Sequence, residues 1–313
     1  MAETQSWASA PSRPAKRRAP VARFRRWVGG SFTPYLYIAP FFLFFLGVFG
    51  YPLGYAFYVS LHRWSGLGAM RDVGLGNYTF VLTDDFWWSA VGTTAALWLL
   101  IVPLGTALSL LLAVAWNRRG FRGLGVSRIL WLVPTVSSLV AVSAVFRILY
   151  DRDYGPINVL LGIAHIPAIP WLTSETWSKP AIAIVRLWES VGLFALFFSA
   201  ALQNISQDIY DAAAVDGCAP LRQFWHMTLP LLTRTILFLT VIQTLGVLGL
   251  FIEPSLITTG GPGISTITIG LYLYHLIQGL DLGTSSAVAF LTTAMMLAIA
   301  GVMSLVARRW QFD

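Results

Sequence analysis

Long apolar stretches alternate with short polar segments along most of this chain. A helix needs about 20 apolar residues to cross the hydrocarbon core of a bilayer, which is about 30 Å thick. Six stretches reach that length, at residues 34–61, 89–116, 127–149, 181–203, 235–258 and 285–307. Each is continuously apolar rather than alternating with a period of two, which argues against a transmembrane β-barrel. The pattern therefore predicts an all-α integral membrane protein with six transmembrane helices.

The composition agrees with a protein whose solvent is largely lipid. Charged residues make up 11% of the chain and hydrophobic residues 56%, whereas soluble domains are about a quarter charged. The first apolar stretch is longer than the hydrophobic region of a secretory signal peptide and no small-residue cleavage site follows it. We therefore expect a retained first helix. The one cysteine, Cys218, has no internal partner for a disulfide, and a packing role is expected for it.

The net charge of +7 could indicate a nucleic-acid-binding protein, but the basic residues are distributed as in a membrane protein. They gather before the first stretch, between the second and third stretches and after the last one: Arg13, Lys16, Arg17, Arg18, Arg23, Arg25, Arg26, Arg118, Arg119, Arg122, Arg128, Arg308 and Arg309. Six spans would place all three segments on one side of the membrane. Because basic loops stay in the cytoplasm, we expect both termini there. Residues 1–30 are expected to form a flexible basic tail that meets anionic lipid and no nucleic acid.

One amphipathic passage interrupts the apolar pattern after the fourth stretch, at residues 208–232 (DIYDAAAVDGCAPLRQFWHMTLPLL). Ser206 suits a helix N-cap, and Gly217 suits a helix stop with positive φ. Pro220 suits the first turn of a second helix, and Pro230 is expected to end that helix. The passage therefore predicts two short helices joined at a glycine corner on the cytoplasmic side.

Such a helix pair could lie on the lipid surface or bind another protein. Helices that lie on a membrane favour basic polar faces. This passage instead carries Asp208, Asp211 and Asp216 against a single arginine, Arg222. Residue types and spacing therefore favour a protein-binding element.

The same residues resemble the cytoplasmic signature of binding-protein-dependent ABC permeases. That signature reads Glu-Ala-Ala, three residues, Gly, nine residues and then Ile-x-Leu-Pro. The resemblance is carried by Asp211, Ala212, Ala213, Asp216, Gly217, Met227, Leu229 and Pro230. Asp211 stands where the family usually has Glu, and Cys218 where it often has Ala. Both departures preserve charge or small size.

Four further segments resemble the carbohydrate subfamily of these permeases. They are YPLGYAFYVSLHRW at residues 51–64, GLGNY at 74–78, YDRDYGPIN at 150–158 and TTGGP at 258–262. The Gly-Pro-Ile-Asn type of loop is more similar to the first of the two carbohydrate permeases, the maltose and glycerol-phosphate type, than to the second.

The resemblance implies a permease subunit of an ATP-driven importer for a sugar or sugar derivative, in the bacterial cytoplasmic (inner) membrane. Residues 31–313 would form the transmembrane permease domain, and residues 206–230 a coupling element that fits a cleft on a cytoplasmic ATPase. Implied partners are a second permease subunit in a heterodimer, two ATPase subunits and an extracytoplasmic sugar-binding protein. ATP and Mg²⁺ would be bound by the ATPase, with no cofactor in this chain. The implied ATPase-coupling residues are Asp211, Ala212, Ala213, Asp216, Gly217, Leu229 and Pro230.

The residues agree with this implication on one point. Lys16 and Lys179 are the only lysines, and neither follows a Gly-x-x-x-x-Gly pattern that would form a phosphate-binding loop. The energy for transport must therefore come from a partner or from an ion gradient.

Polar residues in the fourth and fifth stretches are candidates for a solute pathway, because charges at membrane depth are costly and usually pair or line a wet cavity. Arg186 and Glu189 are spaced for an ion pair on one helix face, which is either purely structural or beside the solute. The fifth stretch is expected to be one helix with its polar residues roughly on one side. The candidate pathway residues are Trp188, Glu189, Gln243, Gly246 and Glu253.

Two other classes of protein stay open at this point. A secondary carrier would need intramembrane carboxylates and an internal helix repeat; Glu189 is the one clearly embedded acid, and no convincing repeat is visible. A membrane enzyme acting on lipid-linked sugars would need clustered acids or histidines at one interface, and the acid pairs at 84–85 and 151–153 are sparse. The histidines lack metal-ligand spacing, so neither a metal site nor a catalytic residue is predicted.

Overall fold

The computed structural model describes residues 33–118 and 123–309, so the predicted basic tail at residues 1–30 lies outside the described part. The chain divides into two compact units, Met1–Ala56 and Phe57–Asp313. The described residues of the first unit form α2 (Thr33–Phe45), the π-helix η1 (Leu46–Gly50) and the beginning of α3 (Tyr51–Ser60). These helices are apolar along their length, as expected for a first membrane span.

The second unit begins with the end of α3 and a small antiparallel hairpin of β1 (His62–Arg63) and β2 (Arg71–Asp72). The next helix, α4 (Gly76–Thr83), is tied to this corner by the buried Asn77. Its Nδ2 donates to the carbonyl oxygens of Ser60 and His62, at 2.8 and 2.9 Å. Within the described ranges this hairpin is the one departure from the predicted all-α class.

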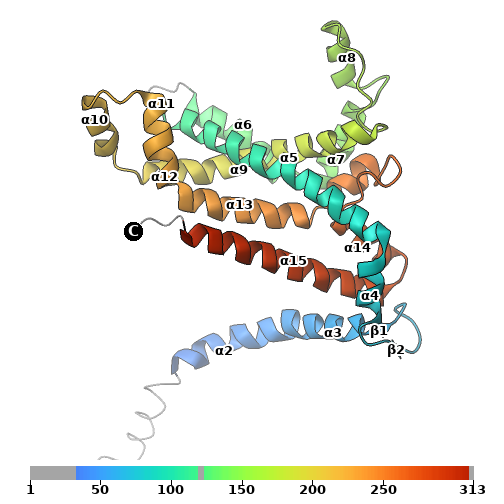
Figure 1. Ribbon diagram of the computed structural model, residues 1–313. Coiled ribbons are helices and arrows are strands. Elements are labelled where there is room, and N and C mark those ends of the chain that lie inside the picture. Colours follow the sequence, from blue (N-terminus) through green and yellow to red (C-terminus); the bar gives the residue numbers. More distant parts are fainter. Residues whose placement is uncertain (1–32, 119–122, 310–313) are drawn as a thin grey trace, which may run out of the picture. The chain divides into compact units, whose positions relative to one another are not determined.

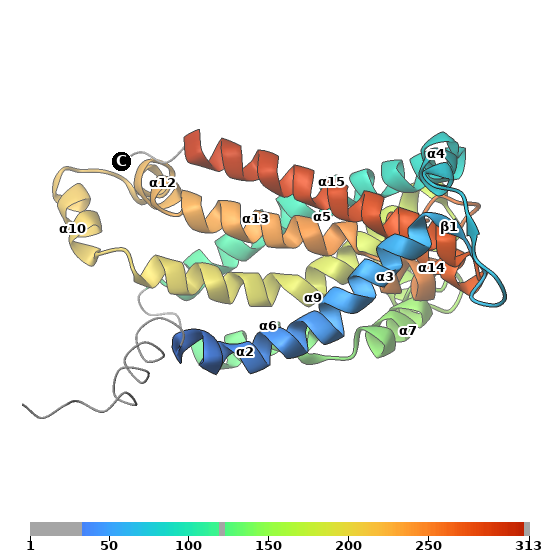
Figure 2. The ribbon, with the colours of Figure 1, turned by 90° about the horizontal axis from the view of Figure 1, so that it is seen from below.

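Four long helices form the body of the second unit: α5 (Asp85–Trp116), α9 (Glu175–Gln203), α13 (Thr233–Leu248) and α15 (Leu282–Arg309). Figures 1 and 2 show them side by side, with α5 packed on α9 and α13, and α15 packed on α13. Small residues allow the close approach of α5 and α9. Ser109 on α5 is fully buried, and its Oγ donates to the Val191 carbonyl on α9 at 3.2 Å.

The third apolar stretch is not one straight helix, which corrects the prediction for residues 127–149. It forms α6 (Leu124–Val136) and α7 (Leu139–Leu149), which meet at an angle of 98°. The Ser137 Oγ donates to the Val133 carbonyl at 2.9 Å and so competes with the backbone bonding that would continue α6. α6 packs closely on α9: a Cβ on Gly192 of α9 would overlap the carbonyl of Trp131 on α6.

The fifth stretch is also broken, so the prediction of a helix over residues 235–258 is wrong. α13 ends at Leu248, and the chain resumes as the π-helix η3 (Pro254–Thr258) before the Gly-Pro turn. The break persists because tertiary groups bond to it. A continuing helix would leave the Leu250 carbonyl without a donor, because residue 254 is a proline and has no N–H. The Thr268 Oγ1 instead donates to this carbonyl at 2.5 Å.

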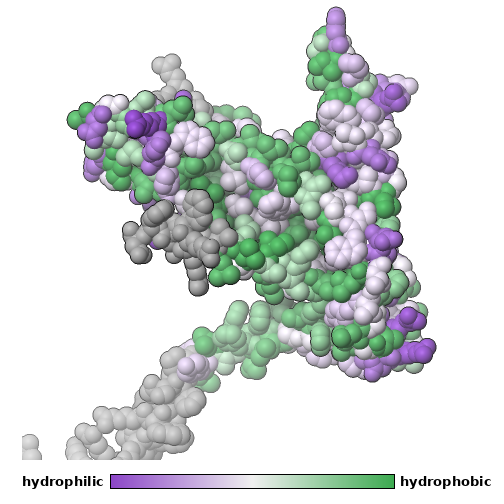
Figure 3. Space-filling model, viewed as in Figure 1, coloured by the Kyte–Doolittle hydropathy of each residue, from purple (hydrophilic) through white to green (hydrophobic). Residues whose placement is uncertain are grey.

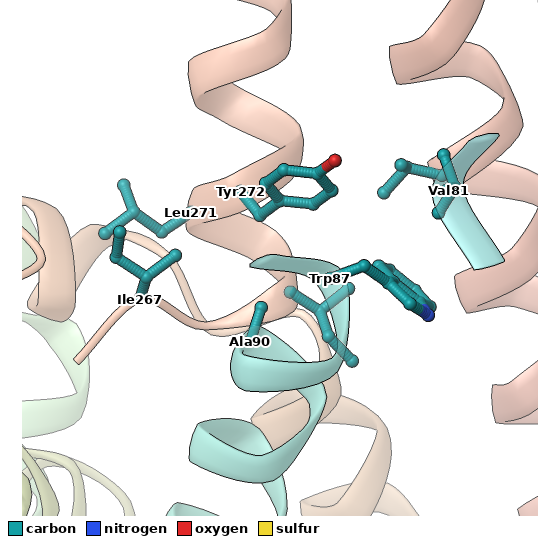
Figure 4. Close-up of a cluster of buried hydrophobic side chains, with 8 residues drawn as sticks. Val81, Trp87, Ala90, Ile267, Leu271 and Tyr272 are labelled. Carbon is teal, nitrogen blue, oxygen red and sulfur yellow. The ribbon is translucent and has the colours of Figure 1, made fainter. Parts of the chain in front are cut away.

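The end of the unit that carries α4 and α14 (Ile269–Gln278) has its own apolar core, shown in Figure 4. Trp87 at the start of α5 and Tyr272 on α14 lie in this core with their rings 6.2 Å apart. The Tyr272 hydroxyl donates to Asp84 Oδ2 at 2.8 Å. The pKa of Tyr272 is raised above its ordinary value, mainly by burial and to a lesser extent by this bond to Asp84. The core therefore holds the beginning of α5 against α14. The short helix α8 (Pro156–Ile163) lies in the connection between α7 and α9.

The described residues contain four helices long and apolar enough to cross a membrane, or up to six if each bent pair is one span. The four are Tyr35–Ser60, Asp85–Trp116, Glu175–Gln203 and Leu282–Leu305, and the bent pairs are α6–α7 and the helices at Pro220–Leu231 and Thr233–Leu248. Figure 3 shows hydrophilic side chains gathered at the two ends of the second unit, with an apolar band between them. The class predicted from the sequence, a helical protein with several spans, is thus confirmed.

Candidate functional site

A helix pair projects from one end of the second unit, where the fourth stretch ends (Figure 1). Its first helix is α10 (Gln207–Val215), and the Ser206 Oγ accepts the Asp208 N–H at 3.3 Å, as the predicted N-cap. Gly217 has a φ of +76°. The N–H of Cys218 then bonds to the Ala213 carbonyl at 2.9 Å, and that of Gly217 to Ala214 at 3.0 Å. This is the glycine-dependent helix stop that the sequence predicted.

The second helix ends at Leu231, one residue after the predicted end at Pro230, and the chain then bends by 68° into α13. Helical backbone runs through α11 (Pro220–Gln223), the π-helix η2 (Phe224–Thr228) and α12 (Leu229–Leu231). In η2 the Leu229 N–H bonds five residues back, to the Phe224 carbonyl. A proline crowds the carbonyl four residues before it, and the wider turn just ahead of Pro230 keeps the helix continuous.

A hydrogen bond joins the two helices of the pair, and several of their apolar side chains are exposed. The hydroxyls of Tyr210 on α10 and Thr228 on η2 are 3.0 Å apart and share a hydrogen bond. Val215 is 88% exposed and Leu221 71% exposed, beside the exposed carboxylates of Asp211 and Asp216. Exposed apolar side chains rimmed by charges are typical of protein-binding surfaces. Of the predicted coupling residues, Ala213 is buried within the pair.

An ion bridge joins α9 to the chain after α13. Arg186 Nη1 lies 2.6 Å from Glu189 Oε2 on the same helix and 3.6 Å from Glu253 Oε1. The side chain of Glu253 is 2% exposed, whereas those of Arg186 and Glu189 are about one-fifth exposed, at 23% and 18%. Gly246 leaves room for the guanidinium, because a Cβ there would lie 3.2 Å from Arg186 Nη2. The structure thus brings Glu189, Gly246 and Glu253 together around one arginine.

The contact between Arg186 and Glu253 was not foreseen in the sequence. A continuous fifth helix would have placed Gln243 and Glu253 on one side of the same rod. The break after Leu248 instead turns Glu253 back toward α9. Two local signals mark this break: Gly249, which directly follows the last residue of α13, and Pro254, which has no N–H to continue the helix.

Gln243 occupies a separate buried position between α13 and α5. It is 6% exposed, and its Nε2 donates to Thr106 Oγ1 at 3.2 Å. Its Oε1 is buried without a hydrogen-bond partner in the described structure. A Cβ on Gly105 would lie only 2.6 Å from this oxygen, so any larger residue there would displace the Gln243 amide from its present position. Thr106 is a partner that sequence spacing could not reveal, since it lies on another helix.

Trp188 lies apart from the other pathway candidates, next to α7. It is 39% exposed, and its ring lies 5.4 Å from that of Phe146 on α7. The structure therefore does not gather all five candidates at one point. Nor do the described residues contain a group of three or more metal-ligating side chains.

Comparisons with known proteins agree with these features. The family model of the binding-protein-dependent transport system inner membrane component matches residues 105–311. The lactose transport system permease protein of Rhizobium radiobacter is 37% identical over 72% of this chain and 76% of its own length. The trehalose/maltose transport system permease protein of Thermococcus litoralis is 31% identical over 84% of this chain and 90% of its own.

A solved structure shares the fold. It is a chain of a bacterial alginate ABC transporter in complex with an alginate pentasaccharide-bound periplasmic protein. The TM-score is 0.78 at 21% sequence identity, over 92% of this chain and 98% of that chain.

Several helices long enough to span a membrane, together with a projecting helix pair, are the features of a multi-span membrane protein. The family match extends over more than half of the residues, and relatives above 30% identity extend over most of them. The chain therefore belongs to the binding-protein-dependent transport system inner membrane components, the permeases of ABC importers. Members of this family are transport subunits and not enzymes. The comparisons give no support to a secondary carrier or to an enzyme acting on lipid-linked sugars.

Proposed function

We propose that this chain is one half of a heterodimeric permease that imports a sugar or sugar derivative delivered by an extracytoplasmic binding protein. The observation that carries the proposal is the family match together with the names of the similar permeases. Those proteins are named for the transport of lactose, of trehalose and maltose and, in Agrobacterium fabrum, of sulfoquinovosyl glycerol. The second permease subunit completes the pathway.

The proposed topology has six spans in the bacterial cytoplasmic membrane, with both termini in the cytoplasm and residues 31–313 as the permease domain. The bent pair α6–α7 then forms the third span, and α13 with η3 forms the fifth, after the coupling element. The basic residues support this orientation. Trp116, at the end of α5 next to Arg118, packs in one core cluster with Phe224 of the projecting helix pair, so the basic connection and this pair share one end of the bundle.

In this proposal the helix pair at residues 206–230 is the coupling element, which binds one of two cytoplasmic ATPase subunits. ATP and Mg²⁺ are bound there and not by this chain. The exposed Val215 and Leu221, beside acidic side chains, give the pair the character of a protein-binding surface. The brace between Tyr210 and Thr228 lets both helices move as one body.

Reconstitution tests the proposed function. We expect vesicles that contain this chain and its second permease subunit to take up no labelled lactose, maltose or trehalose, with or without an ion gradient. Adding the ATPase pair, ATP and the binding protein should start uptake of the cargo. Uptake driven by an ion gradient without any ATPase would overturn the proposal in favour of a secondary carrier.

We further assign Trp188, Glu189, Gln243, Gly246 and Glu253 to the border of the solute pathway. The unpartnered Oε1 of Gln243 supports this assignment, because a buried acceptor without a donor is costly and a sugar hydroxyl would satisfy it. The partial exposure of Glu189 supports it as well.

Exchanging two of these residues should alter uptake while assembly is retained. Glu189→Gln leaves Arg186 paired with Glu253, and Gln243→Ala removes the acceptor. Each loses about one hydrogen bond to the solute, so we expect uptake at low cargo concentration to fall about fivefold. Thr293→Ala on α15 is the control, since that exposed hydroxyl bonds only to Ala289 of its own helix. Unchanged uptake kinetics in both variants would remove these residues from the pathway.

A further inference from the structure

Four polar side chains form a donor cluster at the end of the bundle that carries the helix pair. Asn117 follows α5, Arg128 lies on α6, and Ser199 and Gln203 lie on α9. None of them belongs to the coupling element or to the candidate pathway. We define these four residues, Asn117, Arg128, Ser199 and Gln203, as the donor cluster.

The donors of this cluster converge on a single oxygen. The Ser199 Oγ receives Asn117 Nδ2 at 2.9 Å, Arg128 Nη2 at 3.2 Å and Gln203 Nε2 at 3.4 Å. A hydroxyl oxygen offers two acceptor positions. Three N–H groups therefore compete for two acceptor positions. Asn117 Nδ2 also donates to the Ala113 carbonyl at 2.8 Å, so the donor capacity left for a further acceptor lies with Arg128 and Gln203.

The arginine of the cluster also lacks a counter-ion. No carboxylate of the described residues lies within 4.0 Å of the Arg128 guanidinium, whereas Arg186 has two. Arg128 lies over the Trp116 ring, 5.7 Å from its centre, and its Nε is buried without a partner. A cation held partly out of water without an anion is energetically unfavourable. The charge and the free donors together are the chemistry of an anion site.

The surroundings of the cluster are those of a membrane surface. Its floor is buried, with Trp116 at 2% and Ser199 at 1% exposure, while Asn117 and Gln203 are exposed at its mouth. Next to Arg128 on α6, the apolar side chains of Val126, Ile129 and Leu130 are 64%, 64% and 65% exposed. We place this surface against hydrocarbon, because exposed apolar side chains on a membrane span need an apolar environment. The cluster therefore lies at the level of lipid headgroups, with room for acyl chains beside it.

We infer that the donor cluster binds the phosphate of an anionic phospholipid. Arg128 supplies the charge and two N–H groups in a fork, and the amide of Gln203 adds a further donor beside the phosphate oxygens. Asn117 holds the Ser199 hydroxyl in place. The acyl chains lie along the exposed side of α6. That the lipid belongs to the inner leaflet rests on the proposed topology; the binding itself does not.

Lipid retention by the purified transporter tests this inference. The assembled complex is exchanged into phosphatidylcholine vesicles with or without phosphatidylglycerol, extracted, and examined by native mass spectrometry. We expect the wild type to retain phosphatidylglycerol and Arg128→Gln to retain about tenfold less, because hydrogen bonds to a charged group are lost. Arg118→Gln is the matched control, since Arg118 is exposed at the same end and outside the cluster. Ser199→Ala keeps every N–H donor of the cluster and should retain the lipid.

Three outcomes would overturn the inference. Equal retention by Arg128→Gln and the wild type would exclude the site. An equal loss in Arg128→Gln and Arg118→Gln would indicate a diffuse surface charge instead. Displacement of the lipid by inorganic phosphate would identify a free-anion site. Binding of the ATPase subunits, measured on the same samples, separates these results from a failure of the proposed function.

Discussion

Replacing Gly217 with valine is expected to stop transport while the chain still inserts and folds. Gly217 has a φ of +76°, a conformation that β-branched residues strongly disfavour. No atom lies within 4 Å of a Cβ placed there, so the effect comes from backbone strain and not from a clash. Strain of this kind amounts to about 1–3 kcal/mol. The correct corner would then be disfavoured by a factor of about 5 to about 150, because about 1.4 kcal/mol is a factor of ten.

The corner matters because the proposed coupling element depends on it. Opening it would break the bond from the Cys218 N–H to the Ala213 carbonyl and separate α10 from α11. We expect the Gly217→Val transporter either to lose its ATPase subunits on purification or to hydrolyse ATP without uptake. Uptake in vesicles and co-purification of the ATPase are the measurements.

A matched glycine gives the control for this prediction. Gly123, at the N-cap of α6, also has positive φ, at +79°, and equally open space around it. Gly123→Val introduces similar strain outside the coupling element and should leave co-purification of the ATPase unchanged. Gly217→Asn, which tolerates positive φ, should restore most of the uptake. Normal transport by Gly217→Val would show that the corner has no role in coupling.

Removing Arg186 is expected to give the largest loss of stability among single charge changes in the described spans. Arg186→Gln leaves the carboxylates of Glu189 and Glu253 without their common cation, and Glu253 is 1% exposed. Breaking a buried ion pair by removing one partner costs about 3–5 kcal/mol. We expect a value of about 3 kcal/mol, at the low end of this range, because Arg186 and Glu189 are partly exposed.

The pairing of Arg186 with Glu189 and Glu253 predicts which variants lose more stability than others. Glu253→Gln should cost less than Arg186→Gln, since Arg186 keeps its 2.6 Å bond to Glu189. The double variant should be more stable than the sum of the single effects implies, because it removes the bridge from both sides. Arg147→Gln, an exposed arginine on α7, should change stability by less than about 0.5 kcal/mol. Unfolding midpoints in detergent measure all four. Equal losses for Arg147→Gln and Arg186→Gln would contradict the bridge.

The class, the long apolar helices and the glycine corner could be predicted because each depends on neighbours in sequence. Hydrophobic length alone identifies α5, α9 and α15 as candidate spans. The Ser206 cap and the Gly217 stop are formed within a few residues, so local chemistry is sufficient to predict them. The sequence motif around Asp211 resembled the same family that the comparisons then identified.

The breaks in the third and fifth stretches were missed because hydrophobic length takes no account of local helix breakers. Ser137 bonds through its hydroxyl to the Val133 carbonyl, and Pro254 has no N–H for the Leu250 carbonyl. The interruption after Leu248 is held by Thr268, a residue 18 positions away, whose hydroxyl satisfies the Leu250 carbonyl. Periodicity carries no information about such a partner. An apolar run containing a break therefore has the same pattern as one continuous helix.

The sequence by itself thus determined the solvent of this protein, its helical class, its family and the glycine-cornered helix pair. The tertiary structure alone decided that Arg186 bridges Glu189 and Glu253, that Gln243 bonds to Thr106, and that three donors converge on Ser199. The physical reason is the range of the interactions involved. Burial preference and helix capping act over one or two turns of chain, whereas a buried charge or amide takes its partner from whichever helix packing brings beside it.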